Sequence, residues 1–399
     1  MQQSLTDAKR IQSIDVLRGL VMVIMALDHV RDAVHISANI DDPLNLATTT
    51  PALFFTRWIT HFCAPVFMFL SGTSIFLQSL RKSKKELSAF VLKRGLWLIL
   101  MEFTVIAFAW TFNPFFNVIP FAVIWAIGIS MVVLSFAIRL PFKAILVLGL
   151  IIALGHNLLD IPESAPGFKA GFWWDLLHHG HFTGYEFAPR YFAIIVYPFV
   201  PWAGLMMLGY CFGRFFAPDF SAERRRKILL QLGSGLLLFF VIVRFINIYG
   251  DPHPWATQKD GFTTFLSFIK VHKYPPSLMY MSMTIGVALL FLAFIEKVRN
   301  GFTNVMNVFG RTAFFYYIIH IYVIHLIATV LFFTRGHSMQ VAIDSMPNLP
   351  FLFLIPGEGY SLLVTYIVWL LLIIALYPIC KWYDGYKTRH KEKKWLSYL

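Results

Sequence analysis

Long apolar stretches alternate with short polar ones along nearly the whole chain. Runs long enough for helices of about 20 residues, the length that crosses a bilayer, occur at about 14–36, 53–80, 89–112, 118–138, 142–160, 191–214, 227–249, 275–296, 307–333 and 360–383. The pattern predicts an all-α fold, a polytopic integral membrane bundle of about ten transmembrane helices. We expect one transmembrane domain over residues 1–399, with spans from 14 to 383 and a basic cytoplasmic tail at 384–399.

Composition supports a membrane protein. The chain has 399 residues, of which 58% are hydrophobic and only 14% charged, whereas soluble domains have roughly 25% charged residues. The net charge of +13 does not indicate a nucleic-acid partner, because the basic residues are spread over short loops. The spacing of Cys63, Cys211 and Cys380 fits neither a disulfide framework nor a zinc site. The first run carries charges and is followed by no small-residue cleavage site, so we expect it to remain as a helix.

The basic residues predict the orientation of the bundle. With an even number of spans both termini lie on one side, and the segments on that side carry roughly three times as many lysines and arginines as those on the other. We therefore expect both termini in the cytoplasm. Two outer loops, 161–190 and 250–275, are long, and long loops often carry binding residues.

The first apolar run has charged residues at both ends. Asp15 and Arg18 lie where it begins, and Asp28, His29 and Asp32 lie where it ends. On a helix with ~100° and ~1.5 Å per residue, His29 lies nearly above Arg18, roughly 16 Å along the axis. Ionisable residues inside a membrane span are costly and by default mark a functional path.

Histidines occur at a similar expected depth on three spans. His29, His61 and His320 all fall in the middle or outer half of their helices, with His325 further along the last of them. They could converge on one cavity that opens outward. The alternative is that each histidine bonds a neighbouring helix and only stabilises the bundle. The adjacent carboxylate of Asp28 favours a proton-handling role for His29.

The cytoplasmic ends of the first and third spans are basic. Arg18, together with Lys93 and Arg94, could hold an anionic ligand such as a nucleotide phosphate, which arginine binds well. Alternatively, Asp15 and Arg18, three residues apart on one face, form an ion pair that anchors the helix end. Glu102 is a further buried charge, with no partner evident from the sequence.

The outer loop 161–190 contains a short histidine cluster. His178, His179 and His181 have a spacing that can bind metal, but in an exposed loop it is a weak signal. We expect no metal.

Several motifs resemble one family. The opening RIQSIDVLRGLVMVIMALDH is similar to that of membrane acyltransferases related to heparan-alpha-glucosaminide N-acetyltransferase, including the bacterial group often called DUF1624. APVFMFLSGTSIFL (64–77), YPPSL (274–278) and FGRTAFFYYIIHIYVIH (309–325) resemble other segments of that family. A looser similarity reaches the acyltransferase-3 group, whose opening matches Asp15, Arg18 and Gly19 and whose helix-end histidine matches His29. The histidine context of the lysosomal enzyme, His-x-x-Trp-Asn-Gly, is absent, and His61 is the nearest candidate there.

The resemblance implies acyl transfer across the membrane, which we expect to be a bacterial cytoplasmic membrane. Acetyl-CoA or another acyl-CoA would be the cytosolic donor, and an amine or hydroxyl of an extracytoplasmic sugar or glycan the acceptor. The expected catalytic residues are His29, Asp28, Asp32, His61 and His320, and the expected CoA-binding residues are Arg18, Asp15, Lys93 and Arg94. Asp28 or Asp32 could orient His29 or stabilise its protonated form.

Two alternative functions remain open. A proton-coupled transporter or exporter would use Asp28, His29 and His320 as a proton relay, although no internal repeat is evident. An envelope scaffold would have no turnover. The sequence also leaves open whether the chain forms a homodimer.

Overall fold

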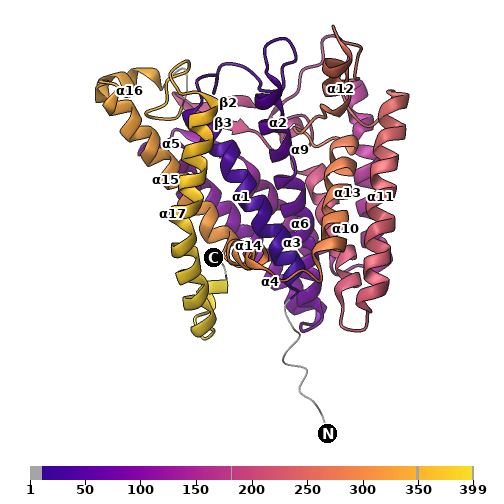
Figure 1. Cartoon of the computed structure of the whole chain (residues 1–399). Helices are drawn as coiled ribbons and strands as arrows, with labels where there is room; N and C mark the ends of the chain where they lie inside the picture. Colours follow the sequence, from indigo (N-terminus) through magenta and orange to yellow (C-terminus); the bar gives the residue numbers. More distant parts are fainter. Residues whose placement is uncertain (1–10, 181, 347–349, 398–399) are drawn as a thin grey trace.

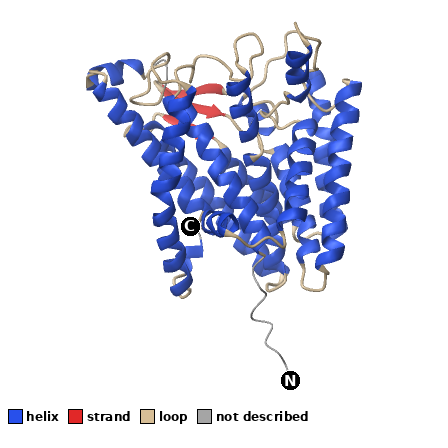
Figure 2. Cartoon of the chain, viewed as in Figure 1, coloured by secondary structure: helices blue, strands red, loops and turns tan. Residues whose placement is uncertain are grey.

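The fold is a bundle of helices with a small sheet at one end (Figures 1 and 2). The computed structural model describes residues 11–180, 182–346 and 350–397. The strands β2 and β3 and the short helices α12 and α16 lie at one end of the bundle, here called the sheet end (Figure 1). The other end is called the opposite end.

Seventeen α-helices and three strands make up the described chain. The α-helices are α1 Gln12–Val34, α2 Pro51–Thr60, α3 Cys63–Ser79, α4 Lys84–Met101, α5 Ala107–Thr111, α6 Val123–Ala137, α7 Phe142–Gly155, α8 Asp160–Glu163, α9 Phe172–Leu177, α10 Val200–Phe212, α11 Ala222–Ile246, α12 Gly261–Ile269, α13 Leu278–Ile295, α14 Gly301–Arg311, α15 Ala313–Thr334, α16 Met339–Ser345 and α17 Leu362–Arg389. A π-helix, η1 Glu102–Ile106, joins α4 to α5, and short 3₁₀ helices are η2 His156–Leu159, η3 Gly213–Phe216 and η4 Lys394–Ser397. The strands are β1 Val118–Phe121, β2 Thr183–Ala188 and β3 Tyr191–Ile195.

The small sheet corrects the all-α expectation. Strand β3 lies in the middle, parallel to β1 and antiparallel to β2. Two apolar runs expected to be helical from their first residue, 118–138 and 191–214, begin as strands, and their helices start only at Val123 and Val200. The first residues of both runs are rich in β-branched and aromatic side chains, which favour a strand.

Other helix boundaries also differ from the apolar runs. The second run is broken at His61 and Phe62, between α2 and α3, and the ninth is broken at Thr312, between α14 and α15. The last helix continues to Arg389, six residues into the expected tail. The apolar runs do not reveal these breaks, because apolar residues continue on both sides of each one.

Six helical segments are long and apolar enough to cross a membrane: Pro51–Ser79, Phe142–Glu163, Ala222–Ile246, Leu278–Ile295, Ala313–Thr334 and Leu362–Arg389. Each of the ten predicted runs contains a helix. The number of crossings and the side on which the termini lie stay predictions. The helix α1, with 23 residues, lies within the length range of these six segments, and 16 of its residues are buried.

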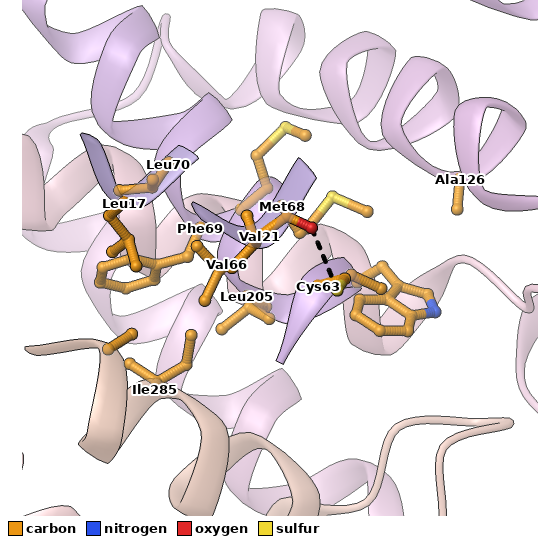
Figure 3. Packing of buried hydrophobic residues seen from close by; sticks show 14 of the residues in the cluster. Leu17, Val21, Cys63, Val66, Met68, Phe69, Leu70, Ala126, Leu205 and Ile285 are labelled. Atoms are coloured by element: carbon orange, nitrogen blue, oxygen red, sulfur yellow. Dashed lines mark hydrogen bonds between the residues drawn. The ribbon is translucent and has the colours of Figure 1, made fainter. Parts of the chain in front are cut away.

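The first helix lies at the centre of the bundle. It packs against α2, α3, α13, α14, α15 and α17. Its apolar side chains meet those of α3, and the thiol of Cys63 donates to the carbonyl of Val21 at 3.3 Å (Figure 3). Figure 3 shows Leu17 and Val21 of α1 among Val66, Met68, Phe69, Leu70, Leu205 and Ile285. A charged helix is therefore surrounded by protein rather than lipid.

Glycines allow two pairs of helices to approach closely. A Cβ on Gly19 of α1 would lie 1.8 Å from the carbonyl oxygen of Met306, and one on Gly310 of α14 would lie 1.8 Å from that of Asp15. Gly72 of α3 and Gly209 of α10 meet in the same way. Small residues at helix crossings are typical of membrane bundles, where packing replaces the hydrophobic effect as the driving force. The Arg18-Gly19 pair of α1 and the Gly310-Arg311 pair of α14 thus lie next to each other.

Candidate active site

The sheet end of α1 contains a buried cluster of charges. One carboxylate oxygen of Asp28 lies 2.9 Å from Nη2 of Arg31, and the other is bound by Arg57 of α2. Arg31 also binds Asp32 at 2.6 Å. Asp28 and Arg31 are buried, and such pairs offset their desolvation only when the geometry is good. Asp28 and Asp32 are therefore engaged by guanidinium groups.

His29 is held by His320 of α15. Nδ1 of His29 lies 2.8 Å from Nε2 of His320, and Nδ1 of His320 lies 2.8 Å from the carbonyl oxygen of Tyr316. The two rings are stacked with centroids 5.0 Å apart, and the edge of Trp110 packs on His29 at 4.8 Å. The residue that orients His29 is thus His320, where the sequence had indicated Asp28 or Asp32.

This hydrogen-bond chain assigns the protons of both rings. A carbonyl only accepts, so Nδ1 of His320 donates to Tyr316, and Nε2 of a neutral His320 is an acceptor. His29 must then donate from Nδ1, which leaves its Nε2 unprotonated. No hydrogen bond within the described residues occupies this Nε2, and the His29 side chain is half-buried. His29 therefore has one ring nitrogen, Nδ1, fixed by His320 and the other, Nε2, able to act as a base.

His61 lies apart from this pair. It occupies the break between α2 and α3 and is 1% exposed, with its ring against Tyr280 of α13 at 5.4 Å. The hydroxyl of Tyr280 donates to the backbone carbonyl of His61 at 2.7 Å, while Nδ1 of His61 is buried without a partner. Of the three histidines expected to converge, the structure joins His29 and His320. His325 instead bonds the backbone carbonyls of Ala109 and Leu352.

A loop before α13 adds a lysine and tyrosines to the site. Lys273 is 9% exposed, and its ammonium lies 4.9 Å from the ring centre of Tyr274. Tyr274 interacts electrostatically with Arg57, Lys273 and Tyr197. Burial raises the pKa of Tyr274, but the Lys273 and Arg57 cations outweigh it, so the net shift is downward. The pKa of Tyr197 is raised, chiefly by burial.

Asp251 fixes this loop in place. One of its carboxylate oxygens accepts from the backbone N–H of His272 at 2.9 Å and from the hydroxyl of Ser277 at 2.8 Å. Arg244 lies 3.6 Å from the other oxygen and also donates to four backbone carbonyls of the loop and α12. Burial raises the pKa of Asp251. The position of Lys273 is thus set by backbone hydrogen bonds.

The opposite end of α1 contains a smaller polar site. Arg18 binds Asp15 at 2.9 Å and the hydroxyl of Ser74 on α3 at 2.9 Å, and it also reaches the carbonyl of Gly310. Lys93 is exposed on α4, and Arg94 is half-buried on the same helix. The assignment of Arg18, Asp15, Lys93 and Arg94 to a bound CoA stays a prediction.

Glu102 has a partner that the sequence did not reveal. Its Oε2 accepts from the backbone N–H of Trp125 at 2.8 Å, in the first turn of α6. The first N–H groups of a helix have no partner within it, and the residue before α6, Ala122, has no side-chain cap. Glu102 therefore caps another helix, and its role here is structural.

The segment from Asp160 to His178 holds groups that could bind a metal. Among the described residues, Asp160, Glu163 and His178 offer ligand atoms within 4.8 Å of one another. Each already has a partner: Glu163 binds His178 at 2.9 Å and Trp174 at 2.8 Å, and Asn157 donates to Asp160. Of the expected histidine cluster, His178 is buried in this network, His179 pairs with Asp175, and His181 lies outside the described residues. The expectation of no metal stays a prediction.

Sequence reasoning missed Arg57, Lys273, Tyr274 and Tyr197 as parts of the site. In the sequence, Arg57 and Lys273 only add to the count of basic residues in the segments on the side away from the termini. Their signal is a basic residue one turn inside the second apolar run and another directly before the Tyr-Pro-Pro motif. Nothing in the sequence places these two segments next to α1.

The apolar helices, with a charged and histidine-containing cluster enclosed among them, define an integral membrane protein with a buried polar site. The sequence matches the family model described as heparan-alpha-glucosaminide N-acetyltransferase, catalytic, over residues 10–244. Because the match covers more than half of the chain, the chain belongs to this family, and membership indicates a transmembrane acetyltransferase. No sequence among curated proteins matches the chain. The matched region contains Arg18, Asp28, His29 and Arg57 but ends before Lys273 and His320.

Proposed function

We propose that this protein transfers an acetyl or other acyl group from a cytosolic acyl-CoA to an amine or hydroxyl of a sugar or glycan on the other side of the membrane. The observation that carries the proposal is the chain from His29 through His320 to the carbonyl of Tyr316. It leaves Nε2 of His29 unprotonated, on a side chain that is only partly buried. The family membership supports the same reaction class.

In the proposed reaction, His29 acts as the general base. Nε2 of His29 takes the proton of the acceptor N–H or O–H as that atom attacks the thioester carbonyl. The new bond joins the acceptor to the acyl carbon, the carbon–sulfur bond breaks, and the proton passes from His29 to the CoA thiolate. General-base catalysis by a positioned histidine contributes about 100- to 10,000-fold to the rate. His320 holds the ring and shares the positive charge that forms on it. Transfer through an acyl-histidine intermediate is a variant of the same scheme.

The other proposed site residues act at a distance from the acyl group. Arg18, with Asp15, Lys93 and Arg94, would hold the CoA phosphates at the opposite end of α1, so that the acyl arm extends toward His29. Asp28 and Asp32 would hold Arg31 and Arg57 in place. His61 would lie in the wall of the site that binds the acceptor.

The proposed topology puts donor and acceptor on different sides. About ten crossings with both termini in the cytoplasm of a bacterial cell place the sheet end outside, and the excess of basic residues on the termini side supports this orientation. The tail at 384–399 would then lie at the anionic cytoplasmic leaflet.

Acetyl transfer by the purified full-length chain tests the proposal. The protein, reconstituted in lipid nanodiscs, is incubated with radiolabelled acetyl-CoA and a panel of sugars, amino sugars and glycans, and labelled products are separated. We expect a labelled acceptor and free CoA. A folded sample that neither binds CoA nor transfers label would overturn the proposal.

The hydrogen-bonded His29–His320 pair also fits a proton relay, so the same protein in sealed vesicles is assayed for transport. A proton-coupled transporter would move an unmodified substrate in response to a pH gradient. We expect no such flux without covalent modification of the substrate.

A further inference from the structure

The sheet-end site contains more cations than carboxylates. Arg31, Arg57 and Lys273 act electrostatically on Asp28, and Asp32 is the second carboxylate in the cluster. Arg31 and Arg57 are bound to these acids, but no carboxylate in the described part of the chain forms an ion pair with Lys273. A nearly buried ammonium without a counter-charge is costly, because burial removes its water.

Two further buried nitrogen atoms at this site have no partner. They are Nε of Arg31 and Nδ1 of His61. Buried polar groups are nearly always hydrogen-bonded. Nε–H of Arg31 is always a donor, so its open hydrogen bond beside a surplus cation indicates the position of a missing acceptor, and Nδ1 of His61 can also donate to an acceptor when it carries the ring proton. The mechanism proposed above uses neither Lys273 nor these two atoms.

The pKa of Tyr274 indicates the same excess of positive charge. Tyr274 lies against Lys273 and interacts electrostatically with Arg57. Burial alone would raise the pKa of its phenol, yet the neighbouring cations shift it downward. The surplus charge is therefore not neutralised by the surrounding side chains.

We infer that the acceptor carries an anionic group, a carboxylate or a phosphate ester, which binds at Lys273 while the reacting amine or hydroxyl lies at His29. The inference rests on the proposed function and adds the substrate class. Lys273 acts electrostatically on both Asp28 and His29, so the ammonium belongs to the same site as the proposed base. The loop that presents the ammonium is held by hydrogen bonds to Asp251.

Binding of matched sugar pairs tests the inference without requiring turnover. Calorimetry on the full-length protein in nanodiscs compares methyl glucuronide with methyl glucoside, and glucose 6-phosphate with glucose. We expect the charged member of at least one pair to bind about 10- to 100-fold more tightly, the effect of a hydrogen bond to a charged group. The pair that shows the preference distinguishes a carboxylate from a phosphate ester.

Variants of Lys273 assign the effect to this site. Lys273→Met should abolish the preference for the charged sugar without changing the affinity for the neutral one, and Lys273→Arg should retain most of it. Lys270→Met is the matched control: Lys270 lies three residues away, is partly exposed and pairs with Asp42 at 3.6 Å. It should leave the preference intact.

Three results would overturn the inference. They are equal binding of charged and neutral sugars, equal weakening of both by Lys273→Met, and a loss of CoA affinity in Lys273→Met, which would assign the cation to the donor phosphates. A charged sugar that binds through Lys273 but is never acylated would instead overturn the proposed function and leave the anion site standing.

Discussion

The two ends of α1 are built on different principles. At the opposite end, Gly19 and Gly310 bring two backbones together, and the partly exposed Arg18 pairs with Asp15 and Ser74. At the sheet end, charged groups from α1, α2 and the loop before α13 are enclosed together with a histidine pair. The structure of the opposite end depends on the close fit of two backbones, whereas that of the sheet end depends on interactions between charged groups.

This difference indicates which end can do chemistry. The close glycine contact leaves no room for a substrate between α1 and α14, so a ligand at that end must lie outside this helix crossing. The sheet end contains an unprotonated ring nitrogen, a surplus cation and unpartnered buried donors, which are the parts of a reaction site. Four changes, taken from the largest expected effect to the smallest, test this contrast.

His29→Ala should lower kcat for acetyl transfer by about 100- to 10,000-fold, because it removes the general base. The measurement is product formation from labelled acetyl-CoA, with CoA binding to show that the donor site is intact. His35→Ala is the control, since His35 lies just past the end of α1 and its ring bonds Ser37. Equal activity of His29→Ala and the native chain would remove the catalytic role.

Asp28→Asn should destabilise the protein by about 3–5 kcal/mol, because Arg57 loses the carboxylate it pairs with and the buried Arg31 keeps only Asp32. Thermal unfolding of purified protein measures the loss. The same change at the other end, Asp15→Asn, breaks a pair with a partly exposed arginine and should cost about 1 kcal/mol or less. Equal losses at the two ends would contradict the contrast.

Gly310→Ala should cost about 1–3 kcal/mol, because the added methyl group meets the carbonyl of Asp15 and forces α1 and α14 apart. Gly301→Ala, in the first turn of the same helix, meets no atom within 4 Å and should not destabilise. The melting temperatures of the two variants are compared. A stable Gly310→Ala variant would show that the close crossing is not required.

Lys93→Met should raise the KM for acetyl-CoA by about threefold or less, since an exposed cation contributes little and is screened by salt. The rise should shrink further in high salt, while kcat stays unchanged. A large fall in kcat would mean that Lys93 touches the reacting groups, which its exposed position on α4 argues against.

Much of the fold could be predicted from apolar runs, because burial in lipid requires long uninterrupted helices. The breaks at His61 and Thr312 and the strands at 118–121 and 191–195 could not, since they depend on neighbours far along the chain. The pairing of His29 with His320 links residues 291 positions apart, whereas helix and strand periodicity relates only residues that are close in sequence. Asp28 was expected to orient His29, but its carboxylate is bound by Arg31 and Arg57.

The sequence by itself determined that α1 is a helix with polar groups at both ends, because helical periodicity and the cost of charge in lipid are local properties. It also pointed to the family, whose model matches residues 10–244. Only the tertiary structure decided which groups meet: glycine contacts and Arg18 at one end, and His320, Arg57 and Lys273 around His29 and Asp28 at the other. The reason is that a hydrogen bond or ion pair depends on distance in space, and the packing of six helices around α1 sets those distances.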